Sequence, residues 1–157
     1  MWASYVITAA AVIPMALLGT KATDVGPWYR GLKKPKWNPP DWAFVVVWTT
    51  LYILIIASVG LAWNNATGEQ RGTLVWVTAV NFLLNAVWSF VFFKWKKIGW
   101  ALVEMSALWL SIVVMIVVVF PYSSLSGWLL MPYLTWVTIA FLLNTSIFLK
   151  NRTGVVG

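Results

Sequence analysis

The amino-acid sequence predicts an all-α integral membrane protein, a single domain over residues 1–157 that forms a bundle of five transmembrane helices. Three observations support this class. Of the 157 residues, 61% are hydrophobic and 10% are charged, whereas soluble domains are about 45–50% apolar and about 25% charged. A soluble fold of this size could not bury so much apolar surface. The apolar residues also fall into five long stretches, and the basic residues are distributed very unevenly between the loops.

Each apolar stretch approaches the length of about 20 residues that a membrane-spanning helix requires. We expect these helices over residues 2–18, 43–63, 73–93, 98–120 and 126–149. Prolines fall inside the first and the fifth helix, and a bundle tolerates them because neighbouring helices satisfy the freed backbone groups.

The basic residues indicate the orientation of the bundle. Ten of the eleven Lys and Arg residues lie in the loop 21–42, in the turn 94–97 and at 150–152. With five spans these segments are all on one side, and the other side carries only Arg71. Cytoplasmic loops are enriched in basic residues. We therefore predict that the N-terminus lies outside and the C-terminus inside.

The composition also excludes several kinds of chemistry. The chain has no Cys and no His, which excludes disulfides, thiol catalysis, Cys/His zinc sites and acid–base catalysis by His. It contains no phosphate-binding loop, no GxSxG motif and no cluster of metal ligands. We predict no cofactor and no metal. The net charge of +7 reports membrane topology here, so no nucleic-acid partner is expected.

The loop 21–42 is the most distinctive segment outside the helices. It holds four of the seven prolines, together with Trp28, Trp37 and Trp42. Because proline restricts its own φ and the residue before it, we expect an ordered loop. It is either an interfacial aromatic belt or a lid over the mouth of the bundle, and composition alone favours the belt.

The third predicted helix carries Asn81, Asn85 and Ser89 at intervals of four residues, so the three side chains share one face. Amides are costly in hydrocarbon unless they have partners. This face therefore points into the bundle, where it forms either hydrogen bonds between helices or the polar strip of a ligand pocket.

Aromatic residues mark the faces of two further helices. Trp48 and Tyr52 are one turn apart in the second helix, and Trp136, Ala140 and Asn144 follow one face of the fifth. The small Ala140 would leave room beside a flat aromatic wall. Spacing alone favours ordinary packing of a Trp-rich core over a pocket.

Glu104 is the only carboxylate inside a predicted span. An acid at such a position is a functional-site candidate by default. The alternative is an ion pair with a lysine of the turn 94–97, and the position of Glu104 near the helix end favours that pair.

Four stretches resemble a known family. Residues 28–40 follow the pattern W-Y-x-x-L-x-K-P-x-W-x-P-P, and residues 85–93 follow N-x-x-W-x-x-x-F-F. Residues 99–104 read GWALVE, and Pro132-Tyr133-Leu134 precedes Trp136. Nearly the whole chain is similar to the translocator protein family, also called tryptophan-rich sensory proteins or peripheral-type benzodiazepine receptors.

The resemblance implies a homodimeric five-helix bundle with a ligand pocket under the first loop. Family members bind porphyrins, sterols and synthetic benzodiazepine-site ligands. The sterol-associated pattern of animal members, which needs a Tyr, is absent from residues 143–150, and this favours a bacterial member in a cell membrane. Carried over position by position, the ligand-binding residues are Trp37, Asn38, Trp48, Asn81, Asn85, Trp100, Trp136 and Ala140.

We therefore predict a receptor-like membrane protein that binds a porphyrin or a similar flat hydrophobic molecule. Its other partners would be membrane lipid and a second copy of the chain, packed through small-residue pairs such as Ser58/Ala62 and Ala107/Ser111. One alternative is an enzyme that degrades porphyrin with light and oxygen at Trp48 or Trp136. Another is a transporter, although the sequence shows no inverted repeat.

Overall fold

The computed structural model describes residues 2–152, and the predicted inside location of the C-terminus concerns residues beyond that range. The described chain is helical apart from its connections. Its elements, in order, are α1 (Trp2–Ala22), α2 (Pro27–Gly31), α3 (Asp41–Asn65), α4 (Gly68–Ser89), the π-helix η1 (Phe90–Lys94), α5 (Ile98–Val119) and α6 (Ser124–Asn151).

The prediction of five membrane-spanning helices is confirmed: within residues 2–152, five helices are long and apolar enough to cross a bilayer. Several begin or end outside the predicted ranges. The third span begins at Gly68, five residues early, because Gln70 stabilises the start of the helix. Its Oε1 accepts a hydrogen bond from the Thr67 backbone N–H at 2.8 Å, which is half of a capping box. Hydropathy does not register such a polar first turn.

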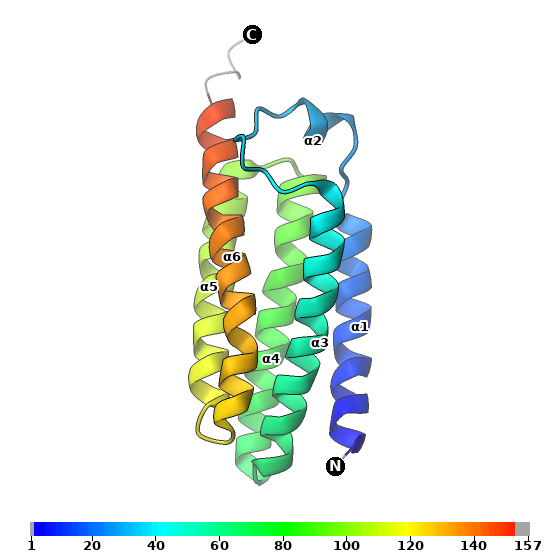
Figure 1. The fold of residues 1–157 in the computed structure, drawn as a ribbon, viewed down its shortest axis with the longest axis vertical. Coiled ribbons are helices and arrows are strands. Elements are labelled where there is room, and N and C mark those ends of the chain that lie inside the picture. The colour runs from blue at the N-terminus through cyan, green and yellow to red at the C-terminus, as the bar shows by residue number, and fades with distance from the viewer. Residues whose placement is uncertain (1, 153–157) are drawn as a thin grey trace.

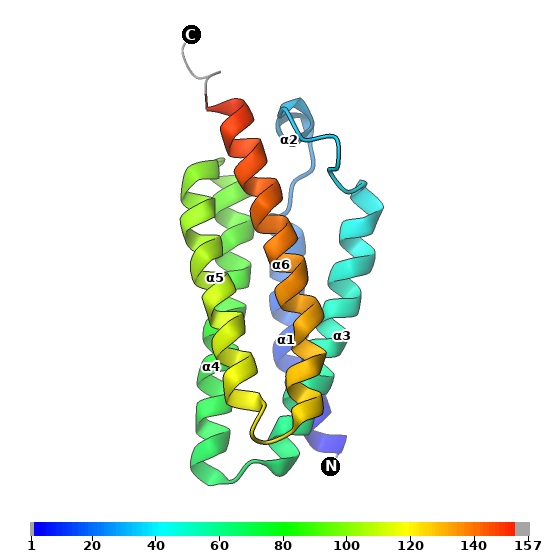
Figure 2. The ribbon, with the colours of Figure 1, turned by 60° about the vertical axis from the view of Figure 1, so that its left-hand side comes forward.

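The five long helices stand side by side as a closed bundle (Figures 1 and 2). Around the bundle, α1 packs on α3 and α4, α3 packs on α6, and α6 and α4 both pack on α5. The loop that contains α2 lies across one end of the bundle, together with the η1–α5 turn and the end of α6 (Figure 1). These three segments carry ten of the eleven Lys and Arg residues. The basic residues therefore gather at one end of the bundle, and the opposite end has only Arg71. Which end faces the cytoplasm stays a prediction.

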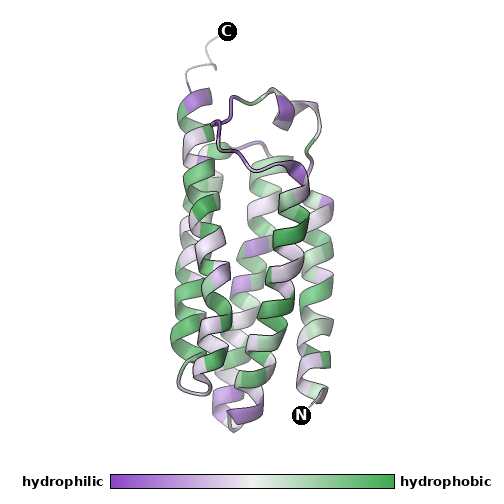
Figure 3. Cartoon of the chain, in the orientation of Figure 1, coloured by the Kyte–Doolittle hydropathy of each residue, from purple (hydrophilic) through white to green (hydrophobic). Residues whose placement is uncertain are grey.

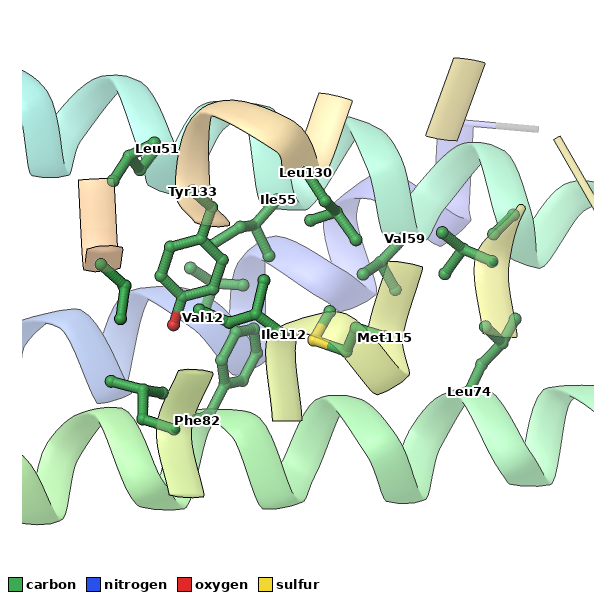
Figure 4. Close-up of a cluster of buried hydrophobic side chains, with 14 of the residues drawn as sticks. Val12, Leu51, Ile55, Val59, Leu74, Phe82, Ile112, Met115, Leu130 and Tyr133 are labelled. Atoms are coloured by element: carbon green, nitrogen blue, oxygen red, sulfur yellow. The ribbon is translucent and has the colours of Figure 1, made fainter. Parts of the chain in front are cut away.

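Hydrophobic residues occur along the length of the long helices (Figure 3), and large hydrophobic side chains are found both inside the bundle and on its outside. Inside, a main core cluster includes Leu51, Ile55, Phe82, Ile112 and Tyr133 (Figure 4). On the outer faces, large side chains such as Trp76, Val103 and Val117 are more than 60% exposed. Exposed apolar surface on every side is what a lipid environment permits and water does not.

One pair of small residues lies elsewhere than predicted. Ser58 and Ala62 are completely buried within the chain, so their assignment to a dimer surface is wrong. The Ser58 hydroxyl donates to the Ser126 carbonyl at 2.8 Å, and this small surface brings α3 and α6 together inside one copy. In the second predicted pair, Ala107 is exposed on α5.

Candidate ligand-binding site

The loop over the end of the bundle docks through its aromatic residues. Tyr29, on α2, is 6% exposed, and its ring centroid lies 5.5 Å from that of Phe93 and 6.2 Å from that of Phe92. Trp28 meets Phe92 edge-on at 5.8 Å. Burial, together with the charge of Asp41, raises the pKa of the Tyr29 phenol to about 12. This part of the loop covers the bundle as a lid.

A second anchor fixes the lid to the end of α6. The Asn151 amide Nδ2 donates to the Lys33 carbonyl, and the Lys33 backbone N–H donates to Asn151 Oδ1, both at 3.0 Å. This paired contact, which we call the lid clasp, joins residues 118 positions apart. Trp37 in the loop and Trp42 in the first turn of α3 are 50% and 68% exposed, and a place for them in an interfacial aromatic belt stays a prediction.

The π-helix η1 makes the surface on which the lid docks. The Trp95 backbone N–H donates to the Phe90 carbonyl, five residues back, at 2.9 Å. In this wider turn, Val91, Phe92 and Phe93 are all buried, and the two phenylalanines meet the Tyr29 ring. Sequence periodicity gave no sign of it.

Below the lid, a hydrogen-bonded polar network joins three helices. The Tyr133 hydroxyl of α6 accepts from Asn85 Nδ2 at 3.0 Å and donates to Asn81 Oδ1 at 3.2 Å. Asn81 Nδ2 donates in turn to Ser111 Oγ of α5 at 2.8 Å. Asn81 and Tyr133 are fully buried. The face of α4 that carries Asn81 was expected either to join helices by hydrogen bonds or to line a ligand pocket. Asn81 joins helices, because both of its bonds go to other helices.

Tyr133 is the residue that sequence reasoning missed at this position. It shares its α6 face with Val137, Ala140 and Asn144, at spacings of four, three and four residues, and that periodicity was the available signal. Figure 4 shows its ring among the core residues, beside Leu51 and Ile55 of α3.

The two predicted tryptophan walls come from neighbouring helices. The Trp48 ring stacks on Tyr52 at 5.6 Å and meets Tyr133 edge-on at 6.2 Å. Trp136, on α6, meets Phe44 of α3 edge-on at 5.7 Å. The structure thus brings Trp48, by way of Tyr133, to the polar network.

Several buried polar atoms of the bundle and the lid lack hydrogen-bond partners within residues 2–152. They include the indole nitrogens of Trp88 and Trp136, both amide atoms of Asn144, and Asn38 Oδ1 in the lid. Asn144 lies one turn beyond Ala140, toward the lid. Because buried polar groups are nearly always paired, such a group of atoms suits a ligand with polar edges. Trp88 and Asn144 were not among the predicted site residues.

Two predicted site residues lie apart from this group. Trp37 is 50% exposed on the lid and Trp100 is 68% exposed on the outside of α5. Trp100 lines a separate surface hollow of about 260 Å³ with Glu104 and Lys97. The expected ion pair between Glu104 and a lysine of the turn 94–97 is absent: among residues 2–152 neither carboxylate oxygen of Glu104 has a partner. The helix places Glu104 about 10 Å along its axis from Lys97.

These features define a class: a multi-pass α-helical membrane protein whose lidded end encloses tryptophans and unpaired polar groups. Residues 5–149 match the model of the TspO/MBR family. The chain belongs to this family, which confirms the resemblance drawn from the sequence.

Curated relatives extend over most of the chain. It is 38% identical over 130 residues to Protein CrtK of Rhodobacter capsulatus, covering 80% of this chain and 79% of that protein. It is 35% identical to the Tryptophan-rich protein TspO of Archaeoglobus fulgidus, covering 90% and 92%. It is 32% identical to the human Translocator protein, covering 80% and 75%. The chain is a multi-pass integral membrane protein, because five of its helices are able to cross a bilayer. Its similarity to bacterial proteins over most of its length is consistent with a bacterial member of the family.

Proposed function

We propose that this protein is a membrane receptor that binds porphyrins and other flat hydrophobic ligands between α3 and α6, beneath the lid. The observation that carries the proposal is that buried polar groups of two tryptophans and an asparagine are left without hydrogen-bond partners within residues 2–152. The indole N–H groups of Trp88 and Trp136 and the Asn144 amide have no partner among the described residues. A tetrapyrrole offers pyrrole nitrogens to such groups and a broad face to the indoles.

The charge of the lid supports the same ligand class. Arg30, Lys33, Lys34 and Lys36 lie in the lid loop, and the Lys34 ammonium sits 4.4 Å from the Tyr29 ring centroid. Carboxylates form strong charge-assisted hydrogen bonds with such cations. The propionates of a porphyrin would reach this basic end while its ring lies among the tryptophans.

Replacing Trp136 with Leu tests the proposal. Leucine keeps the helix but removes the extended aromatic face, and aromatic contacts are worth about 0.5–1.5 kcal/mol beyond burial. We expect the Kd for protoporphyrin IX to rise several-fold, up to about tenfold. The measurement is a titration by tryptophan fluorescence quenching in nanodiscs.

Trp63→Leu is the matched control. Trp63 lies near the far end of the bundle, where Arg71 sits 5.3 Å from its ring, so affinity should stay at the parental value. If Trp63→Leu weakens binding and Trp136→Leu does not, the site is at the wrong end. Illumination of the same samples separates binding from the enzymatic alternative, because breakdown would yield a product spectrum that differs from free photobleaching.

A further inference from the structure

A groove of about 570 Å³ runs along the outside of the bundle between α3 and α6. The two helices pack side by side and diverge toward the lidded end (Figure 2). On α3 the groove is lined by the turns around Val47 and Thr50, and on α6 by the stretch from Trp128 to Ile139.

The groove walls are suited to hydrocarbon. Its polar side chains, Thr50 and Thr135, both donate their hydroxyls to carbonyls of their own helix, those of Val46 and Met131, each at 2.9 Å. No lining side chain carries a charge. Apart from the indoles of Trp128 and Trp136, a molecule in this groove would therefore meet apolar side chains and satisfied hydroxyls, which suits a molecule from the bilayer core.

Trp136 belongs both to this groove and to the interior. Its side chain lines the groove, yet its indole nitrogen is buried and unpaired, and its ring edge meets Phe44. Leu51, also in the groove lining, is 2% exposed and part of the main core cluster. Trp136 thus lies on the bilayer-facing groove and, through its buried indole nitrogen, beside the proposed ligand site.

The lidded end is closed more firmly than this side wall. Access beneath the lid would require breaking the lid clasp at Asn151 and withdrawing Tyr29 from its contacts with Phe92 and Phe93. Between the described residues of α3 and α6, by contrast, hydrogen bonding is confined to Ser58 and Ser126, at the far end of the bundle. Nothing polar holds the two helices together beside Trp136.

We propose that the groove between α3 and α6 is a lateral portal through which the ligand passes from the bilayer to the interior, with Trp136 as its gate. This inference rests on the proposed function, and its ligand is the same flat hydrophobic molecule. Such ligands partition into lipid, so a side portal at the level of the acyl chains admits them without opening the basic lid.

The test fills the groove from either wall. Thr135→Phe and Thr50→Phe add bulk at exposed groove positions and sacrifice only a hydroxyl bonded within its own helix. The protein is loaded with protoporphyrin IX in nanodiscs, and release to excess lipid vesicles is followed by porphyrin emission. A portal predicts that both variants slow association and release by about tenfold while Kd changes by less than about twofold.

Two further variants make the outcome decisive. Leu142→Phe adds similar bulk on the exposed face of α6 outside the groove, and its rates should match the parent. Asn151→Ala removes the lid clasp, and it should leave the rates within about twofold of the parental values if the ligand bypasses the lid. Unchanged rates in both threonine variants, or faster exchange only in Asn151→Ala, would overturn the portal. Absence of specific porphyrin binding by the parent would instead refute the proposed function.

Discussion

Removing the Tyr133 hydroxyl tests whether the polar network holds the bundle together. Tyr133→Phe deletes one oxygen from a fully buried ring, so it leaves no cavity of consequence. It breaks the bonds to Asn85 at 3.0 Å and Asn81 at 3.2 Å. Hydrogen bonds between membrane helices average about 0.6 kcal/mol and reach about 1.7. The two bonds therefore predict a loss of about 1–3 kcal/mol in the free energy of unfolding.

The assay is reversible SDS unfolding in mixed micelles, followed by far-ultraviolet circular dichroism. Tyr52→Phe is the control, because the Tyr52 ring stacks on Trp48 but its hydroxyl bonds no described residue; its cost should stay below about 0.5 kcal/mol. Asn85→Leu should lower the free energy of unfolding less in the Tyr133→Phe variant than in the parent protein. The hydrogen bond between Asn85 and Tyr133 is already missing from that variant. Equal stability of Tyr133→Phe and Tyr52→Phe would refute the reasoning.

Three other predictions concern topology, packing and the lid. Gly31 and Gly68 lie at opposite ends of the bundle and have open space around them, and the chain has no other Cys to react. An impermeant thiol reagent added to intact cells should therefore label the Gly68→Cys variant and not the Gly31→Cys variant. Labelling of Gly31→Cys alone would show that the orientation is the opposite one. A methyl group at Gly60 would overlap the Tyr5 ring of α1, so Gly60→Ala should lower the free energy of unfolding by about 1–3 kcal/mol in the micelle assay. Gly72 has open space around it, and Gly72→Ala, the control, should not lower it. Burial in the docked lid raises the pKa of the Tyr29 phenol to about 12. The lid should therefore be fully docked below about pH 10, the ordinary pKa of a tyrosine, and should lose this stabilisation as the pH rises through about 12. The absorbance difference between the parent and Tyr29→Phe measures that titration, and a midpoint near 10 would indicate an undocked lid.

The sequence by itself determined the number of spans, the class of protein and the family. These follow from local properties, because a span needs only a long enough apolar stretch and a helix satisfies its own backbone. The basic asymmetry is likewise a matter of counting along the chain. The resemblance at residues 28–40 and 85–93 then identified the family that the comparison confirmed.

The tertiary structure alone decided which faces meet. In lipid the outer and inner faces of most of these helices are equally apolar, so hydropathy does not reveal how those helices are rotated. The helix α4 is the exception, because its predicted polar face, with Asn81 and Ser89, is buried in the bundle. For the other helices, this is why Ser58 turned out to face Ser126 within the chain, and why Trp100 lies outside while Trp136 lies between groove and interior. The partners of Asn81 come from helices 30 and 52 residues away in sequence. Only the packing of five helices fixes such distant pairs, because each pair depends on the rotation of both helices at once.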